Sequence, residues 1–165
     1  MRIGIDARMY GPKQTGIGNY IKYLIDYLAR IDKENTYYIF LRKEAYAKYK
    51  ILNTKYHKVL ADYPWYSVAE QTLFFQTLYR HPLDLMHFPH FNAPLFYHRP
   101  FVVTIHDLTP EFFPGEKGGK SWLRRKAYNL VLTHAIKKSR SISTPSQFTK
   151  NDILKHCHVD PQKIV

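Results

Sequence analysis

Apolar residues fall into short runs along the chain, and stretches with helical spacing separate these runs. Residues 2–6 (RIGID) place isoleucines at alternate positions, which is typical of a strand. Residues 16–31 repeat apolar side chains every three or four positions, which predicts an amphipathic helix. The same criteria predict strands at residues 36–42, 57–61, 84–88, 100–107 and 140–146, and helices at residues 44–52, 64–80, 121–139 and 146–156.

This alternation of strands and helices predicts the fold class. It favours an α/β, Rossmann-like domain in which helices cover both faces of a parallel sheet. Residues 101–103 are apolar without alternation, as in a strand that is buried on both faces. The chain stops in the apolar residues 163–165 (KIV), where another strand begins. We therefore expect residues 1–165 to form a single N-terminal domain of a longer protein.

Composition excludes several classes of protein. The 165 residues are 45% hydrophobic and 23% charged, as in an ordinary globular domain with a substantial core. No apolar run approaches the roughly 20 residues needed to cross a bilayer, and the N-terminus has no long apolar segment of a secretory signal. The single Cys157 rules out an intramolecular disulfide and suits a reducing compartment. These features predict a cytoplasmic protein.

The charge indicates an anionic partner. Lys and Arg total 25 against 13 acidic residues, which gives a net charge of +12 and favours nucleic acid, an anionic membrane surface or a phosphorylated ligand. The helix at residues 64–80 is rich in aromatics, and Trp65, Tyr66, Phe74 and Phe75 could form an exposed cluster that touches lipid. The basic segments 42–50 and 124–126 could dock on headgroups. A core helix and solvated basic faces are the alternative.

A glycine-containing turn, residues 11–20 (GPKQTGIGNY), follows the first predicted strand. In a doubly wound sheet this turn lies at the ligand-binding edge, and a helix N-terminus there favours an anion. The spacing excludes a Walker loop, because Ile17 stands where lysine is required, and a dinucleotide fingerprint, because position 21 is Ile. We take Gly16, Ile17, Gly18 and Asn19 as candidate binding residues. The alternative is that the glycines only shape the turn.

Other candidate site residues follow later strands. His106 and Asp107 end a buried strand, where a histidine could act as a base, bind a sugar hydroxyl or bind a phosphate. His87 and His90 have an H-x-x-H spacing, but further metal ligands are lacking nearby, so we favour a loop that lines the crevice together with Asn92.

Hydroxyl side chains surround the last predicted strand-to-helix turn. Thr144 and Ser146 lie there, and a helix N-terminus beside hydroxyls could contact an anion or a sugar. Helix capping explains Ser146 equally well.

Four segments in this order resemble one family. Residues 3–28 (IGIDARMYGPKQTGIGNYIKYLIDYL), 87–95 (HFPHFNAPL), 102–114 (VVTIHDLTPEFFP) and 143–153 (STPSQFTKNDI) resemble the N-terminal half of retaining glycosyltransferases of family 4. This GT-B-fold group includes bacterial mannosyl- and glucosyltransferases. Each segment is loose by itself, but the four together are fairly specific and span almost the whole chain.

The resemblance implies half of an enzyme. Such proteins have two Rossmann-like domains: the N-terminal one mostly binds the acceptor, and the C-terminal one binds the nucleotide-sugar. It implies that Gly16 and Gly18 face the cleft near a phosphate, that His106 lies at the transferred sugar, and that Asp107 and the following loop shape the acceptor site. It also implies transfer of a hexose, with retention, from a nucleotide-diphosphate sugar to a glycan or lipid-linked acceptor, without a metal or other cofactor.

The sequence departs from the family in one respect. The family's arginine/lysine pair and Glu-x7-Glu motif belong to the C-terminal domain, and neither occurs in this chain. We therefore expect the fragment to be inactive by itself and to need that C-terminal domain as its partner.

Two readings of another class stay open. A dinucleotide-binding oxidoreductase requires an acidic residue at the end of the second strand, but this strand ends in residues 40–43 (FLRK), with Glu44 just beyond. A basic binding module for nucleic acid or membrane fits the charge, although no nucleic-acid signature is present and we expect no nucleic-acid partner. Peripheral contact with the inner face of the cell membrane is compatible with the transferase reading.

Overall fold

The computed structural model describes residues 1–11, 15–51, 53–108 and 121–165. These residues contain one parallel six-stranded sheet with strand order β3-β2-β1-β4-β5-β6. The strands are β1 (Arg2–Asp6), β2 (Thr36–Leu41), β3 (Tyr56–Leu60), β4 (Leu85–Phe88), β5 (Phe101–Thr104) and β6 (Ser141–Ser143). The longer helices are α1 (Thr15–Ile31), α2 (Lys43–Lys48), α3 (Phe75–Tyr79), α5 (Ser121–Lys138) and α6 (Gln147–His156). This strand order is that of the Rossmann fold, so the predicted fold class is confirmed.

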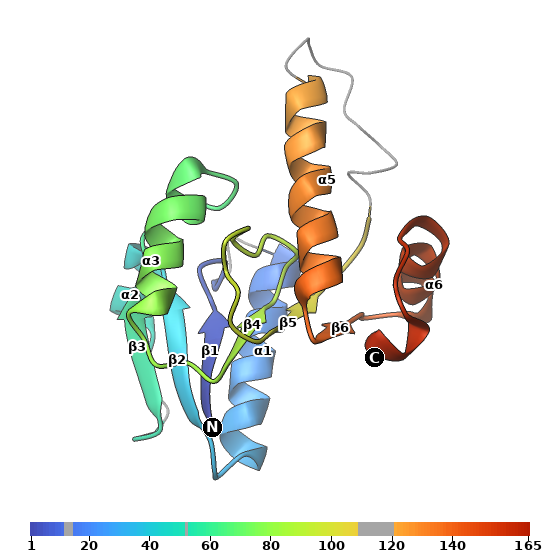
Figure 1. The fold of residues 1–165 in the computed structure, drawn as a ribbon. Coiled ribbons are helices and arrows are strands. Elements are labelled where there is room, and N and C mark those ends of the chain that lie inside the picture. The colour runs from blue at the N-terminus through green and yellow to red at the C-terminus, as the bar shows by residue number, and fades with distance from the viewer. Residues whose placement is uncertain (12–14, 52, 109–120) are drawn as a thin grey trace.

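Helices bury both faces of the sheet (Figure 1). Alternate residues of β2 point to opposite faces: Ile39 packs in the core with α1 and α2, whereas Phe40 packs in the core with α3 and α5. Helix α1 buries Ile21 and Ile25 and exposes Tyr23, as its amphipathic pattern predicts. The two cores together explain why the strands are largely apolar.

The predicted helix at residues 64–80 differs most from the structure. Helical geometry begins only at Val68 and includes the π-helix η2 (Glu70–Phe74) before α3. Pro64 therefore does not start the helix, because Tyr66 adopts a left-handed backbone conformation, with a φ of 58°. Ser67 caps the helix: its Oγ accepts a hydrogen bond of 3.2 Å from the Glu70 amide.

Other predicted elements are shorter in the structure, among them the strands predicted at residues 100–107 and 140–146, which are observed as Phe101–Thr104 and Ser141–Ser143. The helix predicted at residues 44–52 ends at Lys48, because Tyr49 turns into the core in extended conformation. A short 3-10 turn, η3 (Pro161–Lys163), which Asp160 caps, precedes the strand expected to begin at residues 163–165. Only Ile164 pairs with the sheet, through a single parallel bridge to Ile142.

The prediction of an exposed aromatic cluster is also partly wrong. Phe74 is fully buried and forms part of the core, and Trp65 and Phe75 are half-buried. Tyr66 alone of the four is mostly exposed. The π-helical turn and the left-handed residue before it rotate these side chains away from the single face that a regular helix would give them.

Candidate functional site

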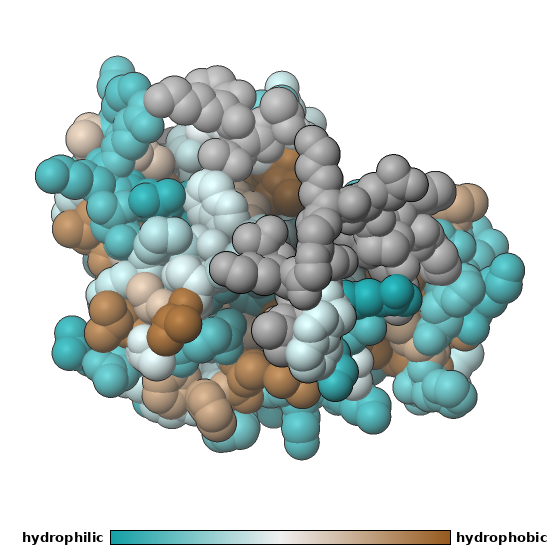
Figure 2. Space-filling model, turned by 90° about the horizontal axis from the view of Figure 1, so that it is seen from above, coloured by the Kyte–Doolittle hydropathy of each residue, from teal (hydrophilic) through white to brown (hydrophobic). Residues whose placement is uncertain are grey.

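The candidate site lies at the carboxyl edge of the sheet, where the strand order reverses between β1 and β4. Ligands of doubly wound sheets bind at this switch point. In Figure 1 the strands end at the top, and α5 and the segment before α3 rise above them. Figure 2 views this edge from above and shows polar side chains around patches of apolar ones. A small pocket opens there, lined by Asp6, Arg8, Met9, Ile17, Ile21, Trp65, Pro89, His90 and Asn92.

A buried ionic network forms the floor of the site. The guanidinium of Arg8 donates two hydrogen bonds to Asp6, of 2.9 and 2.7 Å, and one of 2.5 Å to Oε1 of Glu70. It also lies 3.7 Å from the centre of the Phe74 ring, a cation–π contact. All three charged side chains are almost wholly buried. Because each carboxylate retains a partner, the network is rigid and geometrically specific.

Glu70 connects this network to two neighbouring segments. Its Oε1 also accepts a 2.6 Å hydrogen bond from the amide of buried Asn92, and its Oε2 accepts a 2.9 Å hydrogen bond from the backbone N–H of Tyr66. Burial raises the pKa of Glu70, while the charge of Arg8 opposes that rise. One carboxylate therefore fixes the loop after β4, the turn before η2 and Arg8, two residues beyond the end of β1.

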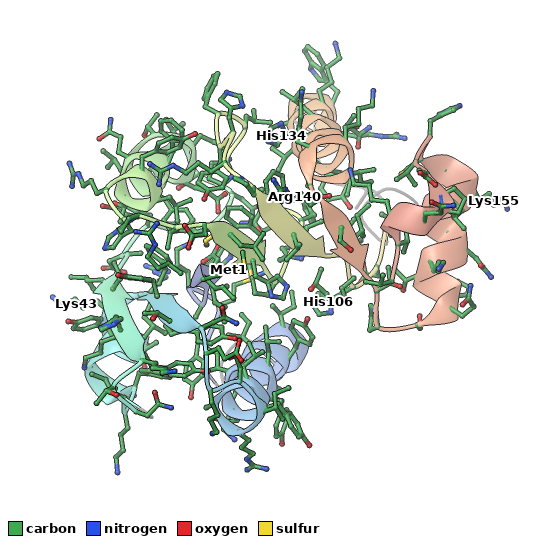
Figure 3. The ribbon with its side chains drawn as sticks, turned by 60° about the horizontal axis from the view of Figure 1, so that its bottom comes forward. Met1, Lys43, His106, His134, Arg140 and Lys155 are labelled. Atoms are coloured by element: carbon green, nitrogen blue, oxygen red, sulfur yellow. The ribbon has the colours of Figure 1, made fainter. Side chains whose placement is uncertain are left out.

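A second hydrogen-bonded chain crosses the same edge. His87 Nε2 lies 2.9 Å from the hydroxyl of Thr104 on β5, and that hydroxyl lies 3.0 Å from the hydroxyl of Tyr20 on α1. The ring of Tyr20 packs edge-on against His106, with 5.0 Å between ring centres. These contacts tie β4, β5 and α1 together beside His106 (Figure 3).

His106 is held in one tautomer when neutral. Its Nε2 lies 2.9 Å from the carbonyl oxygen of Pro89, which can only accept, so Nε2 carries the proton and donates. The neutral ring then has its lone pair on Nδ1. The backbone carbonyl of His106 accepts a 2.9 Å hydrogen bond from the hydroxyl of Thr149 on α6, which fixes the loop after β5. The ring is thus oriented and able to accept a proton or a hydrogen bond.

His90 lies next to His106, with 6.4 Å between their ring centres. Its Nε2 is 2.5 Å from the hydroxyl of Tyr66, and its buried Nδ1 is among the described polar atoms that lack a hydrogen-bond partner. Burial, with the neighbouring His106 as a smaller cause, lowers the pKa of His90 to about 4. His90 therefore stays neutral near pH 7.

The pKa of His87 is also lowered to about 4, chiefly by burial and then by His106. An unfolded histidine titrates near pH 6.5. Between that pH and about 4, His87 therefore binds a proton in the unfolded state but not in the folded state. We expect the stability of the protein to fall as the pH drops from about 6.5 to about 4, and His87→Gln to weaken this dependence. Urea midpoints at about pH 7.5 and pH 5 measure it. His57→Gln, at an exposed position, is the control; an equal pH dependence in wild type and His87→Gln would contradict the assignment.

The glycine-turn candidates occupy the first turn of α1. Gly16 and Asn19 are exposed, Gly18 is buried, and Ile17 lines the pocket described above. The structure therefore brings Ile17 beside Arg8 and His90. Residues 12–14 of this turn lie outside the described residues, as do residues 109–114 of the loop expected to shape the acceptor site.

The remaining predicted residues divide into two groups. His87 and Asn92 belong to the hydrogen-bonded networks at the edge, as described, and exposed Asp107 follows His106 directly. Ser146 caps α6 by accepting from the Thr149 amide at 3.2 Å, so its hydroxyl serves the fold. The backbone N–H of Thr144 donates to Val165.

The described residues offer neither a metal-binding cluster nor a membrane-spanning helix. Within those ranges, no group of three or more His, Cys, Asp or Glu side chains is arranged to hold a metal ion. No helix in the part of the chain that the structure describes combines the length and apolar character needed to cross a bilayer.

Sequence reasoning missed Arg8, Glu70, Tyr20 and Thr104. The sequence could have indicated Arg8 together with Asp6, because charged residues at the end of a buried strand need partners. The indication for Glu70 is weaker: it is the single acidic residue among the aromatics of the predicted helix at residues 64–80. Tyr20 and Thr104 look like ordinary helix and strand residues, so only the packing of α1 against β5 identifies them.

The chain is similar in sequence to a known protein family. A family model described as Glycosyltransferase Family 4 matches residues 14–165. A search of curated proteins found no match. The matched range contains α1, His87 on β4, His106 in the loop after β5, and Glu70, but begins after Arg8.

Proposed function

This chain belongs to glycosyltransferase family 4, and on that premise we propose that it is the acceptor-binding half of a retaining enzyme. Membership supports an enzyme that moves a sugar from a donor to an acceptor. We propose a nucleotide-diphosphate sugar as the donor, a hexose of mannosyl or glucosyl type as the transferred group, and a glycan or lipid-linked acceptor. The nucleotide-sugar would be a co-substrate, and no metal or other cofactor enters the proposal.

The orientation of His106 is the observation that carries this proposal. Nε2 of His106 donates a hydrogen bond to the Pro89 carbonyl, and the ring of Tyr20 packs edge-on against the imidazole. In this arrangement Nδ1 can accept a hydrogen bond or proton from a hydroxyl of the bound sugar. His106 is thus our candidate for the catalytic residue at the transferred sugar.

The start of α1 supports an anion at the same edge. The first backbone N–H groups of a helix lack intrahelical partners and carry a partial positive charge. Gly16, Ile17, Gly18 and Asn19 form this first turn, which has no acidic side chain to compete for those groups. We propose that it faces a phosphate of the donor or acceptor and stabilises charge that develops on a leaving diphosphate.

The partners follow from the same proposal. The net charge of +12 favours peripheral contact with an anionic membrane, where a lipid-linked acceptor would lie. A C-terminal domain would supply the nucleotide-sugar site and close the cleft. We propose supporting roles for His87 and Asn92 in the site and contact roles for Asp107 and Thr144; Ser146 acts through its cap of α6.

Family membership favours glycosyl transfer over the two alternative readings. The structure adds an argument against a dinucleotide-binding oxidoreductase. Arg42, just after β2, donates to Asp62 at 3.0 Å, so the side chain nearest the expected ribose site is cationic and already paired with an acid from beyond β3.

The test uses the full-length protein that contains this chain. It is incubated with UDP-glucose or GDP-mannose and with immobilised oligosaccharides or a bacterial lipid extract, and products are followed by mass spectrometry. We expect one hexose to be added with the donor's anomeric configuration kept, and no transfer by residues 1–165 alone. Absence of transfer from both donors, or an inverted product, would overturn the proposal.

A further inference from the structure

Tyr66 has an unusual backbone conformation. Among the described residues it is the one non-glycine residue with positive φ, 58°. A side chain in this left-handed region costs free energy that glycine or asparagine would largely avoid. Such strain persists only where the surroundings enforce it, and it concentrates at functional sites.

The carboxylate of Glu70 enforces this conformation. Its Oε2 accepts the backbone N–H of Tyr66 at 2.9 Å, and Arg8 and Asn92 hold its other oxygen. Glu70 is 1% exposed and begins the π-helical turn η2, a second local irregularity of a kind often found at functional sites. The turn before η2 is therefore anchored to the buried ionic floor of the site.

The side chain of Tyr66 meets the site on one side and solvent on the other. Its hydroxyl is bonded to His90 Nε2, and its ring lies 6.0 Å from the ring of Phe91. The residue is nonetheless 61% exposed. Tyr66 is thus strained and leaves much of its surface open beside His90, whose ring in turn lies next to His106.

We propose that Tyr66 is an acceptor-positioning residue and that Glu70 holds it in place. The exposed ring is a flat, rigid apolar surface against which the C–H face of an acceptor sugar can pack, and the polar Tyr66–His90 pair lies at its edge. This inference rests on the proposed transferase function. It assigns acceptor recognition to the turn at residues 64–67, while His106 acts on the transferred sugar.

The test measures KM for acceptor and donor separately in the full-length protein, with the acceptor found in the screen above. Tyr66→Gly removes the ring and relieves the strained φ. We expect its acceptor KM to rise about tenfold or more, with donor KM unchanged, because only ground-state binding of the acceptor is lost. Its midpoint of thermal unfolding should equal or exceed that of the wild type.

Three further variants sharpen the test. Tyr66→Phe keeps the ring and should keep most of the acceptor affinity. Glu70→Gln should raise acceptor KM, and combining it with Tyr66→Gly should add little, because both changes act on one contact. Tyr27→Ala is the matched control: Tyr27 is 59% exposed on α1, and its loss should leave both KM values unchanged.

The ratio of acceptor KM to donor KM decides the outcome. If the wild type transfers sugar but Tyr66→Gly leaves this ratio unchanged, the inference is wrong and Tyr66 serves the fold alone. A ratio that rises equally in Tyr27→Ala would also overturn it. If the wild type transfers no sugar, the proposed function fails and this inference fails with it. If the wild type transfers sugar but the KM ratio is unchanged in Tyr66→Gly, this inference alone fails, so the two failures are distinguishable.

Discussion

Replacing His106 by alanine should lower the turnover number of the full-length enzyme by about 10²-fold or more, the usual contribution of a positioned side chain that accepts a proton at the reacting centre. Alanine removes the imidazole ring with its Nδ1 lone pair and its hydrogen bond to Pro89, while the backbone carbonyl of residue 106 keeps its bond to Thr149. The fold should therefore survive. Initial-rate kinetics with saturating donor and acceptor measure the effect.

A second substitution separates the two functions of the His106 ring. His106→Gln retains an N–H that can donate to Pro89 but lacks the basic nitrogen, so we expect it to be nearly as impaired as the alanine variant. His57→Ala, at an exposed site on β3, is the control for loss of a histidine. An unchanged rate in His106→Ala, with an unchanged circular dichroism spectrum, would refute the catalytic assignment.

Arg8→Met should be the most destabilising of the substitutions considered, at about 3–5 kcal/mol, the usual cost of removing one partner from a buried ion pair. The loss would leave the carboxylates of Asp6 and Glu70 buried without their shared cation. It would also remove the cation from the Phe74 ring. Urea unfolding at neutral pH, followed by tryptophan fluorescence, measures the change in free energy of unfolding.

The matched control is Arg2→Met. Arg2 pairs with Asp84 at 2.8 Å in a similar geometry, but 49% and 36% of the two side chains are exposed. Solvent screens an exposed ion pair, so it contributes little to stability and this variant should stay close to the wild type. Equal losses of stability in Arg8→Met and Arg2→Met would show that burial does not set the strength of the network.

Much of the fold was predictable because local patterns and burial agree. The strand at residues 2–6 and the helix at 16–31 match β1 and α1 to within a residue. Parallel order followed from the alternation of strands and helices, since a crossover helix is the usual connection between parallel strands. The helix at residues 64–80 was mispredicted at its start because Glu70 captures the Tyr66 amide, and no periodicity contains that contact.

The candidate site was predictable only in part. His106 stood out because it ends the strand predicted at residues 100–107, and Asn92 because it follows the one at 84–88, and the carboxyl ends of parallel strands meet at one edge. The first of these strands was predicted too long, because β5 ends at Thr104 and His106 lies in the loop after it. Glu70 did not, because its role depends on Arg8, 62 positions earlier in the chain. The H-x-x-H spacing of His87 and His90 invited a metal reading, yet the structure points one imidazole at Thr104 and the other at Tyr66.

The sequence by itself determined the succession of strands and helices, the net positive charge and which residues follow the strands at the carboxyl edge of the sheet, because these depend on periodicity, composition and chain order. The tertiary structure alone decided which polar side chains meet at that edge. Buried charges and strained backbone need partners, and here Glu70 supplies one to both Arg8, 62 residues earlier in the chain, and the backbone N–H of Tyr66, four residues earlier. The long-range contact that joins Glu70 to Arg8 is therefore what gives the site its shape.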